Sequence, residues 1–422
     1  MSSSRPPTTP PAAGSPHELE RRVGGSEKPG NRGGRGGRRR SQRCRATRQR
    51  GAFIVGVWVR ASRADDLPAI SASLRVLRGS LCFLSTNATG DVVSTAPILE
   101  ARNLARVFAV RRSGGLFGRP AQLHAVDDVS FDLAPGETLG LVGESGCGKS
   151  TTAKLVLGLL APSAGEIRFE GAAVPAPGTA AWRALRRRMQ MVFQDPMGAL
   201  DRRLPVGAQV MEPLAIHGLG EAGARRERAQ ALLEAVGLGA HHFDRYPHEL
   251  SGGQRQRIVL ARAMILEPSL LVCDEPISAL DVSIQAQVIN LLLDLQEKYR
   301  LAYLFISHDL KVVRQISHRV AVMYLGRIVE EGDPDEILAE PAHPYSQALV
   351  SAIPVAAAAR RRPRLILKGD PPNPVDRPPG CAFHTRCPVA TARCRDDVPV
   401  LKALGGTRRV ACHVAHGEGG SA

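Results

Sequence analysis

Apolar and polar positions alternate in the stretches that predict an antiparallel β layer. Residues 98–110 and 123–133 both show this pattern, and a segment rich in glycine, 114–120, separates them. Two shorter strands are predicted at 166–171 and 189–193. Both follow the phosphate-loop motif described below, and the second leads into Gln194-Asp195-Pro196.

Three other predicted strands, 138–142, 270–274 and 302–307, are apolar throughout and are therefore expected to be buried. The second of them leads into two adjacent carboxylates, Asp274 and Glu275. That arrangement is typical of a parallel strand with chemistry at its carboxyl end.

Helical spacing appears in two places. Residues 150–160 predict a helix that ends before Pro162. From 205 to 266, apolar residues recur every three or four positions. Because this long stretch lies between two predicted strands, we expect a helical subdomain at about 195–266. The predicted fold is α/β, with a mixed sheet core, an antiparallel β layer and this helical subdomain.

The N-terminal segment differs from the rest in charge and composition. The chain has 422 residues and a formal charge of +16, and residues 1–92 hold 17 of its 56 Lys/Arg but only 6 of its 40 Asp/Glu. We expect 1–92 to be a disordered basic extension. It fits a solvated tail, a segment that binds RNA or an acidic membrane surface, or a start codon assigned too early. The early start codon is favoured, because a valine codon can serve as a bacterial start and residues 93–97, which begin with Val93, immediately precede the first predicted strand.

No stretch of the sequence is apolar enough to cross a bilayer. The longest apolar run of the N-terminal segment, 52–59, is far below the roughly 18–20 residues required and lies too deep for a signal peptide. If the protein works at a membrane, it must dock onto other chains that span it.

Residues 143–151 match the phosphate-loop pattern G-x-x-x-x-G-K-[ST] between a predicted strand and a predicted helix. The glycines let several backbone N–H groups face one phosphate chain, and the helix N-terminus adds partial positive charge. Lys149 is then placed to reach the β- and γ-phosphates, and the Ser150 hydroxyl to coordinate Mg²⁺. Phe108, near the end of the first predicted strand, is either an adenine-stacking aromatic or a core residue.

Polar residues at the ends of predicted strands complete a hydrolytic site. Asp274 would hold Mg²⁺ through water, and Glu275 would polarise the water that attacks the γ-phosphate. Gln194 is either a polar cap or a residue that reaches Mg²⁺ and the attacking water. His308 is either structural or a γ-phosphate sensor.

A second anion site is predicted at 250–257, which reads Leu-Ser-Gly-Gly-Gln-Arg-Gln-Arg. Ser251 is a good helix N-cap, and the glycines 252 and 253 leave bare N–H groups at the start of a helix. Two γ-phosphate sites in one chain suggest that the second serves the nucleotide of a neighbouring subunit.

Four of the eight cysteines, Cys381, Cys387, Cys394 and Cys412, cluster near the C-terminus. ATP-dependent chemistry without an export signal predicts a reducing compartment, where disulfides do not persist. Four thiolates fit a [4Fe–4S] cluster or tetrahedral zinc. Intervening segments of 5, 6 and 17 residues lack the tight C-x₂-C of common zinc ribbons and favour the cluster. Free structural thiols are a third interpretation.

In this order and spacing, the motifs from 98 to about 341 resemble the ATP-binding subunit of an ABC transporter. The resemblance makes 143–151 the Walker A loop, Gln194 the Q-loop residue, 250–254 the signature motif, 270–274 Walker B, Glu275 the catalytic base, 278–281 the D-loop and His308 the switch histidine. Lys149 joins Gln194, Glu275 and His308 as catalytic residues, and Ser150, Gln194 and Asp274 as a set would hold Mg²⁺. The nucleotide would contact Phe108, Gly143, Glu144, Ser145, Gly146, Cys147, Gly148, Lys149, Ser150, Thr151, Gln194, Ser251, Gly252, Gly253, Gln254, Asp274 and Asp281.

The sequence is closer still to that of the dipeptide/oligopeptide importers at 246–254, 278–287 and 343–345. In these segments it resembles the second of the two ATPase subunits of such importers. The tail, with its prolines at 371–374 and its four cysteines, resembles the C-terminal region of oligopeptide transporters, in which such cysteines can hold an iron–sulfur cluster. We therefore predict an ATPase domain at 97–342 and a C-terminal region at 343–422.

This resemblance implies an ATPase that powers import of di- or oligopeptides from the cytoplasmic face of the inner membrane. Its implied partners are a second ATPase subunit, identical or different, two transmembrane permease subunits and, indirectly, an extracytoplasmic peptide-binding protein. Nickel importers share much of the sequence of these segments, so import of nickel is the first alternative to import of peptides. A soluble ABC ATPase acting on nucleic acid or ribosomes is less favoured, because a second nucleotide domain or long coiled-coil insertion is lacking. A specific nucleic-acid partner is not expected. A purely regulatory binder is disfavoured by the presence of Glu275 and His308.

Overall fold

The computed structural model describes residues 96–111, 120–353, 365–367 and 369–418. All of them belong to the second of the two units into which the chain divides, Ser85–Ala422. The predictions for the basic segment 1–92, including the apolar run 52–59, lie outside the described residues.

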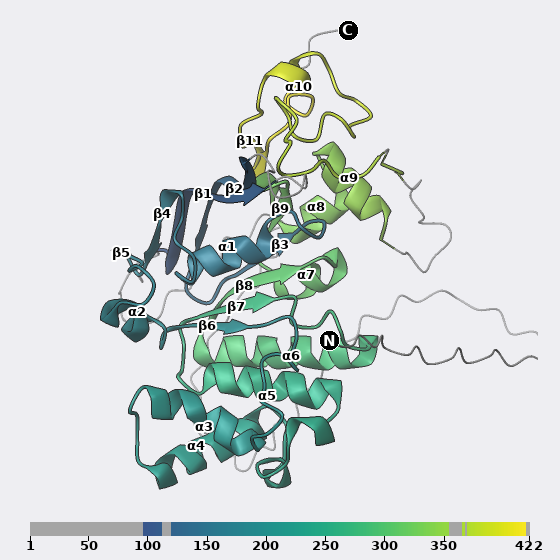
Figure 1. Cartoon of the computed structure of the whole chain (residues 1–422). Coiled ribbons are helices and arrows are strands. Elements are labelled where there is room, and N and C mark those ends of the chain that lie inside the picture. Colours follow the sequence, from purple (N-terminus) through teal and green to yellow (C-terminus); the bar gives the residue numbers. More distant parts are fainter. Residues whose placement is uncertain (1–95, 112–119, 354–364, 368, 419–422) are drawn as a thin grey trace, which may run out of the picture. The chain divides into compact units, whose positions relative to one another are not determined.

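Four antiparallel strands form the predicted β layer, in the order β2-β1-β4-β5 (Figure 1). In β1, Leu99, Ala101 and Leu104 have no exposed surface. Alternation of this kind is expected where one sheet face packs on a core and the other faces solvent. The strands are β1 Leu99–Arg111, β2 Pro120–Leu133, β4 Ala164–Phe169 and β5 Ala172–Ala173.

The larger sheet has eight strands in the order β11-β12-β10-β9-β3-β8-β7-β6. Strands β9, β3, β8, β7 and β6 run parallel to their neighbours, whereas β10, β12 and β11 pair antiparallel at one edge. Parallel pairing brings the carboxyl ends of β3, β7 and β8 to the same side of the sheet. The strands are β3 Thr138–Val142, β6 Met189–Val192, β7 Leu270–Asp274, β8 Ala302–Ser307, β9 Arg319–Tyr324, β10 Arg327–Gly332, β11 Lys402–Gly405 and β12 Arg408–Val410.

This sheet separates two hydrophobic cores, which explains why its central strands are apolar throughout. In β8, Tyr303 and Phe305 pack into the core shared with the helical subdomain. Their neighbours Leu304 and Ile306 pack into the core shared with the β layer. A central strand must therefore present apolar side chains on both faces.

Helices fill the predicted positions, with one difference at the phosphate loop. Helix α1 spans Lys149–Val156 and does not continue to 160. Gly158 adopts the left-handed conformation, with φ of 61°, so the helix ends before Pro162 is reached. The other helical elements are α2 Ala180–Leu185, α3 Val206–Ile216, α4 Ala222–Ala235, η2 Ala240–His242, η3 Pro247–Glu249, α5 Gly252–Met264, α6 Val282–Tyr299, α7 Leu310–Ile316, α8 Pro334–Ala339, α9 Pro344–Ser351 and α10 Arg393–Asp396.

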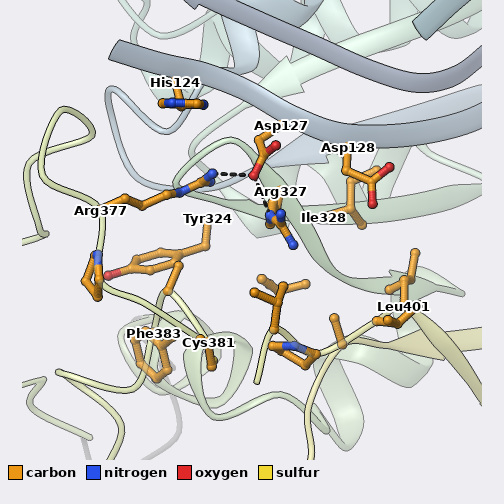
Figure 2. A pocket seen from close by; sticks show the side chains of 18 of the residues that line it. His124, Asp127, Asp128, Tyr324, Arg327, Ile328, Arg377, Cys381, Phe383 and Leu401 are labelled. Atoms are coloured by element: carbon orange, nitrogen blue, oxygen red, sulfur yellow. Dashed lines mark hydrogen bonds and ion pairs between the residues drawn. The ribbon is translucent and has the colours of Figure 1, made fainter. Parts of the chain in front are cut away.

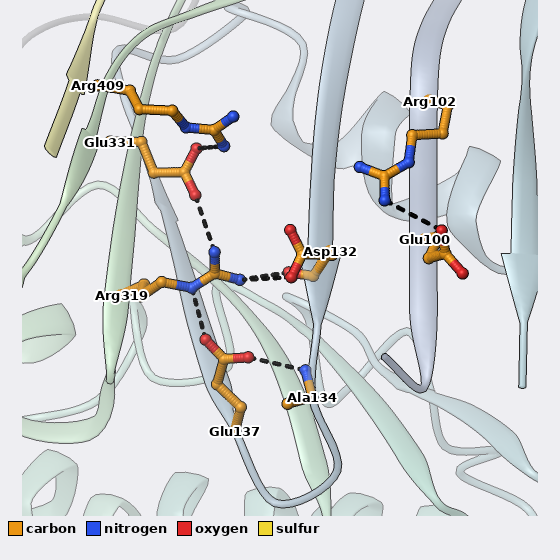
Figure 3. A network of polar contacts seen from close by, with 8 residues as sticks. All are labelled: Glu100, Arg102, Asp132, Ala134, Glu137, Arg319, Glu331 and Arg409. Carbon is orange, nitrogen blue, oxygen red and sulfur yellow. Dashed lines mark hydrogen bonds and ion pairs between the residues drawn. The ribbon is translucent and has the colours of Figure 1, made fainter. Parts of the chain in front are cut away.

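A network of charged side chains around Arg319 joins the two sheets (Figure 3). Arg319, at the start of β9, donates to Glu137 before β3 at 2.6 Å and to Glu331 of β10 at 3.2 Å. It also donates to the backbone carbonyl of Asp132 in β2. Arg409 of β12 holds the other oxygen of Glu331. The antiparallel layer, the parallel core and the C-terminal strands thus share one set of ion pairs.

Candidate active site

The phosphate loop lies between β3 and α1, at the carboxyl edge of the parallel strands. Its backbone requires glycine, because a Cβ on Gly143 would come within 2.2 Å of the Met323 carbonyl oxygen. A Cβ on Gly148 would come equally close to the Ala125 carbonyl oxygen, and Gly148 has φ of 110°. The buried Lys149 amine donates to the carbonyl oxygens of Gly143 at 2.8 Å and Glu144 at 3.0 Å. The lysine thus holds the curled loop.

Two predicted Mg²⁺ ligands meet between the first turn of α1 and the end of β7. The Ser150 hydroxyl donates to the Asp274 carboxylate at 3.0 Å. Burial raises the pKa of the Asp274 carboxyl above its ordinary value, and the hydrogen bond from Ser150 lowers it part of the way back. A hydroxyl and a carboxylate side by side are the hard oxygen donors that Mg²⁺ prefers.

Two predicted catalytic residues converge on the carboxylate of a third. The Glu275 Oε2 atom accepts from the Gln194 amide at 3.1 Å and lies 3.2 Å from the His308 Nδ1 atom. Glu275 follows β7 with φ of 48°, a left-handed conformation that is unfavourable for a non-glycine residue and concentrates at functional sites. Its N–H is held by the Ile306 carbonyl of β8 at 3.0 Å. The strand ends thus fix this side chain beside two groups able to orient it.

The predicted signature motif forms the first turn of α5. Ser251 caps the helix by accepting from the N–H of Gln254 at 3.3 Å, while the Gln254 side chain accepts from the N–H of Ser251 at 2.9 Å. Such a capping box fixes the direction of the remaining N–H groups. Gly253 packs against Ile284 of α6, where a Cβ would meet the Ile284 methyl at 2.5 Å. Asp281, the predicted D-loop residue, is the exposed N-cap position of α6.

Phe108 lies in β1 and is half-buried. The guanidinium of Arg106 stands over its ring, 4.6 Å from the centroid. This contact is a cation–π interaction, which leaves the stacking role of the ring a prediction.

The four C-terminal cysteines do not support the predicted metal site. In the parts of the chain that the structure describes, there is no group of three or more His, Cys, Asp or Glu side chains placed to hold a metal ion. All four are free thiols. Burial raises the pKa of Cys381 to about 11 and raises the pKa values of Cys387 and Cys412 as well. As arranged here, the thiols do not fit the predicted cluster or zinc.

A cavity of about 640 Å³ lies between the β layer and the C-terminal region (Figure 2). The Asp127 carboxylate of β2 accepts from Arg327 at 2.7 Å and from Arg377. Tyr324 and Phe383 form part of its wall. No residue of the phosphate loop lines it, so this cavity is separate from the nucleotide chemistry.

Two contacts to the phosphate loop come from the C-terminal region and were not predicted. The Tyr345 hydroxyl accepts from the N–H of Glu144 at 2.8 Å, and Arg386 donates to the Glu144 carboxylate. These partners are more than 200 residues from Glu144 in sequence. Only an approach in space brings them together, so local sequence patterns carry no signal for them.

Comparison with known proteins identifies the class of protein that this fold and site define. Residues 126–278 match the family described as ABC transporter, and residues 329–394 match the oligopeptide/dipeptide transporter C-terminal region. A structure of cbiO1 from Clostridium perfringens, described as part of the ABC transporter complex cbiONQ, aligns with a TM-score of 0.50 at 28% identity, covering 58% of this chain and 91% of that chain. A dimeric structure of MJ0796, a bacterial ABC transporter cassette, aligns with a TM-score of 0.50 at 26% identity, covering 56% and 98%. The protein is an ABC-type ATPase.

Relatives of known name narrow the class. The chain is 50% identical to a di/tripeptide transport ATP-binding protein, DppF, of Pseudomonas aeruginosa over 75% of this chain and 98% of that protein. It is 49% identical to an oligopeptide transport ATP-binding protein, AppF, of Bacillus subtilis over 75% and 97%. The chain therefore belongs to the family of ATP-binding subunits of dipeptide/oligopeptide ABC importers. Among the helices described, none has the length and apolar character required to cross a membrane.

Proposed function

We propose that this protein hydrolyses ATP to ADP and phosphate and that the cycle powers import of di- or oligopeptides. The observation that carries the proposal is the meeting of Gln194, Glu275 and His308 at the strand ends beside the phosphate loop. The peptide substrate is inferred from family membership and from the names of the relatives.

In the proposed reaction, Glu275 accepts a proton from the attacking water through its carboxylate. Gln194 and His308 orient that carboxylate and face the space where the γ-phosphate would lie. Lys149 would leave the loop carbonyls that it now holds and donate to the β- and γ-phosphates. Fixed charges and positioned donors of this kind stabilise the transition state without a covalent intermediate.

We propose that Mg²⁺ is held by Ser150 and Asp274, with Gln194 as the third residue. When bound, the ion neutralises charge that develops on the phosphate oxygens. The contact between the Ser150 hydroxyl and the Asp274 carboxylate supports the assignment, because it already pairs two oxygen donors at one point.

The signature motif supports a head-to-tail pair of ATPase subunits. The capped first turn of α5 presents the N–H groups of Gly252 and Gly253 at a helix N-terminus, the natural place for a phosphate. We propose that Ser251, Gly252 and Gly253 bind the nucleotide held by Lys149 of a neighbouring subunit. ATP then closes the pair, and hydrolysis opens it.

A groove near Gln194 is proposed as the contact to a membrane-spanning permease. Phe193 is 46% exposed and Ile216 is 72% exposed, and both line a hollow of about 250 Å³ together with residues of α5. Large exposed apolar side chains at a hollow mark interaction sites. Docking here would place the protein at the cytoplasmic face of the membrane and would let Gln194 pass the state of the nucleotide to the permease.

The test is growth of a deletion strain, auxotrophic for one amino acid, on a dipeptide that contains it. Rescue is expected from the wild-type gene and not from a Glu275→Gln gene. In the purified variant, turnover should fall by roughly 10² to 10⁴ while ATP still binds, because a general base typically contributes that much. Near-normal hydrolysis would remove Glu275 from its role. Normal growth without the gene would mean either a redundant ATPase or another substrate, and nickel uptake would be the next measurement.

The cluster prediction is decided by metal content. Protein purified without oxygen should contain iron and absorb visible light if Cys381, Cys387, Cys394 and Cys412 hold a cluster. Stoichiometric zinc without such absorbance would replace the cluster by tetrahedral zinc. Absence of both metals would make the thiols structural.

A further inference from the structure

The C-terminal region holds Glu144 of the phosphate loop at two points. The Glu144 carboxylate accepts two hydrogen bonds from Arg386, from Nη1 to Oε2 at 3.0 Å and from Nη2 to Oε1 at 3.2 Å. The N–H of Glu144 donates to the Tyr345 hydroxyl at 2.8 Å. Because the Lys149 amine also holds the Glu144 carbonyl, the position of this residue is fixed from three directions.

The pair of Arg386 and Glu144 is sheltered from water, unlike most surface ion pairs. The Arg386 side chain is 8% exposed and that of Glu144 is 29% exposed. Bidentate geometry of this kind is the strong form of an arginine–carboxylate contact. Burial alone would lower the pKa of Arg386, but its contacts with Glu144 and, after them, with Tyr324 raise the pKa above the ordinary value. Arg386 therefore stays charged.

Tyr345 is held by an aromatic cluster that belongs to both parts of the chain. Its ring lies 4.7 Å from that of Tyr324 at the end of β9 and 5.5 Å from that of Phe383, measured between centroids. Tyr345 has no exposed surface. Phe383 and Tyr324 also line the cavity of Figure 2, so two rings of the cluster form part of its wall.

A carboxylate in the second position of a loop that receives a polyanion requires an explanation. An unpaired negative charge there would repel the triphosphate, and in a sheltered site this repulsion is weakly screened. Arg386 supplies the compensating charge. We propose that Arg386 is a positioning residue that neutralises and orients Glu144, so that the C-terminal region sets the affinity of the phosphate loop for ATP. The inference rests on the proposed role of this loop in binding ATP.

The experiment measures ATP binding to the full chain by calorimetry, and the KM and kcat of ATP hydrolysis, for matched variants. Arg386→Met removes the charge and keeps most of the side-chain length. It should weaken ATP binding about tenfold, with kcat within about threefold of wild type, because one uncompensated charge near a polyanion has an effect of that order. Arg386→Lys keeps the charge without the bidentate contact, and its ATP affinity should lie between those of wild type and Arg386→Met.

The decisive variant is the double change Glu144→Gln with Arg386→Met. If compensation of charge is the role of Arg386, the double variant, which carries neither charge, should recover ATP affinity to within about twofold of wild type. A double variant that binds ATP as weakly as Arg386→Met would overturn the proposal, and so would wild-type affinity in Arg386→Met.

Arg377→Met is the matched control for a structural role. Arg377 is also a half-buried arginine of the C-terminal region, but its partner is Asp127 of β2. This variant should lose thermal stability and keep ATP affinity. If Arg377→Met loses as much ATP affinity as Arg386→Met, both losses would be assigned to a general loss of stability of the C-terminal region. That result would overturn the proposal.

Tyr345→Phe covers the case in which Arg386→Met does not fold. It removes only the hydroxyl that accepts from the N–H of Glu144 and leaves the ring packed, so ATP affinity should fall two- to fivefold, as expected for one hydrogen bond. Unchanged affinity would contradict the part assigned to Tyr345. A wild-type protein that neither binds nor hydrolyses ATP would contradict the proposed function itself, whereas normal hydrolysis without these dependences would contradict only the present inference.

Discussion

Helices α1 and α5 both begin beside glycines, yet the surroundings of their first turns differ. Before α1, the loop is enclosed: Lys149 is buried, and Glu144 is held by side chains from the C-terminal region. Ahead of α5, Ser251 is exposed and secures the turn through its own capping box. The groups that hold the enclosed turn all belong to its own chain. The open turn has the geometry of a site completed by another molecule.

The largest effect should come from removing the lysine of the enclosed turn. Lys149→Ala takes away the charge placed for the β- and γ-phosphates, and turnover should fall about 10²- to 10³-fold, as for loss of one transition-state donor. Phosphate release measures this. Lys154→Ala, on the same helix but exposed, is the control and should keep activity. Near-normal turnover in Lys149→Ala would leave the enclosed turn without its proposed role.

The open turn can be tested without disturbing the fold. An added methyl on Gly252 would meet only Leu280, at 3.4 Å, so Gly252→Ala should fold normally and bind ATP in the isolated subunit. Its turnover should fall about ten- to a hundredfold, because the methyl group blocks approach of a neighbour's phosphate. Gly223→Ala in α4 has open space around the new methyl and is the matched control. Equal activity of the two variants would argue against a composite site.

Acid should lower the free energy of unfolding through His343, which contacts Tyr345 beside the enclosed turn. His343 is fully buried, accepts from the N–H of Tyr345 through Nδ1, and burial lowers its pKa to about 4. Its contribution to stability is complete above the unfolded pKa of 6.5 and is lost as pH falls from 6.5 towards 4, because the unfolded chain takes up the proton first. The loss should reach about 3 kcal/mol. Urea unfolding between pH 7 and 4 measures it.

The control for that pH dependence is His343→Gln, a neutral side chain at the same position, whose stability should vary less between pH 6.5 and 4. His248→Gln makes the same exchange at an exposed position and controls for the substitution itself; its stability at pH 7 should match that of the wild type. Parallel curves for His343→Gln and wild type would assign the acid sensitivity to other groups.

The smallest effect concerns the cap of the open turn. Ser251→Ala removes the acceptor for the N–H of Gln254 and should lower the free energy of unfolding by about 1 kcal/mol, whereas Ser251→Gly should cost only a few tenths. Chemical denaturation of both variants separates the values. A cost above about 2 kcal/mol would indicate contacts of Ser251 beyond the cap. Helix α1 offers no such test, because its N-cap is already Gly148.

The strands that position the catalytic carboxylates could be predicted well from sequence. Strands β3, β7 and β8 face a core on each side, so their apolar runs coincide with their observed bounds. The end of α1 was harder, since Gly158 stops the helix before the proline that marked it in the sequence. A site built from consecutive residues, such as the phosphate loop, could be recognised in the sequence.

What could not be predicted depends on approach between distant segments. Arg386 gives no local sign that its partner is Glu144, and the antiparallel addition of β12 to β10 joins residues about 80 positions apart. The spacing of the four cysteines suggested metal ligands, but spacing does not determine how side chains meet in space. Burial leaves three of these thiols with raised pKa values.

The edge of the large sheet has a consequence for how this protein can evolve. Glu330 and Glu331 of β10 are almost completely buried, and their arginine partners, Arg408 and Arg409, belong to β12. A chain that ended after residue 343 would expose a strand edge and leave two buried carboxylates without those partners. The tail is therefore not a module that can be lost or exchanged by recombination at its boundary. A change that removes the charge of Glu330 or Glu331 is therefore expected to require a matching change at Arg408 or Arg409.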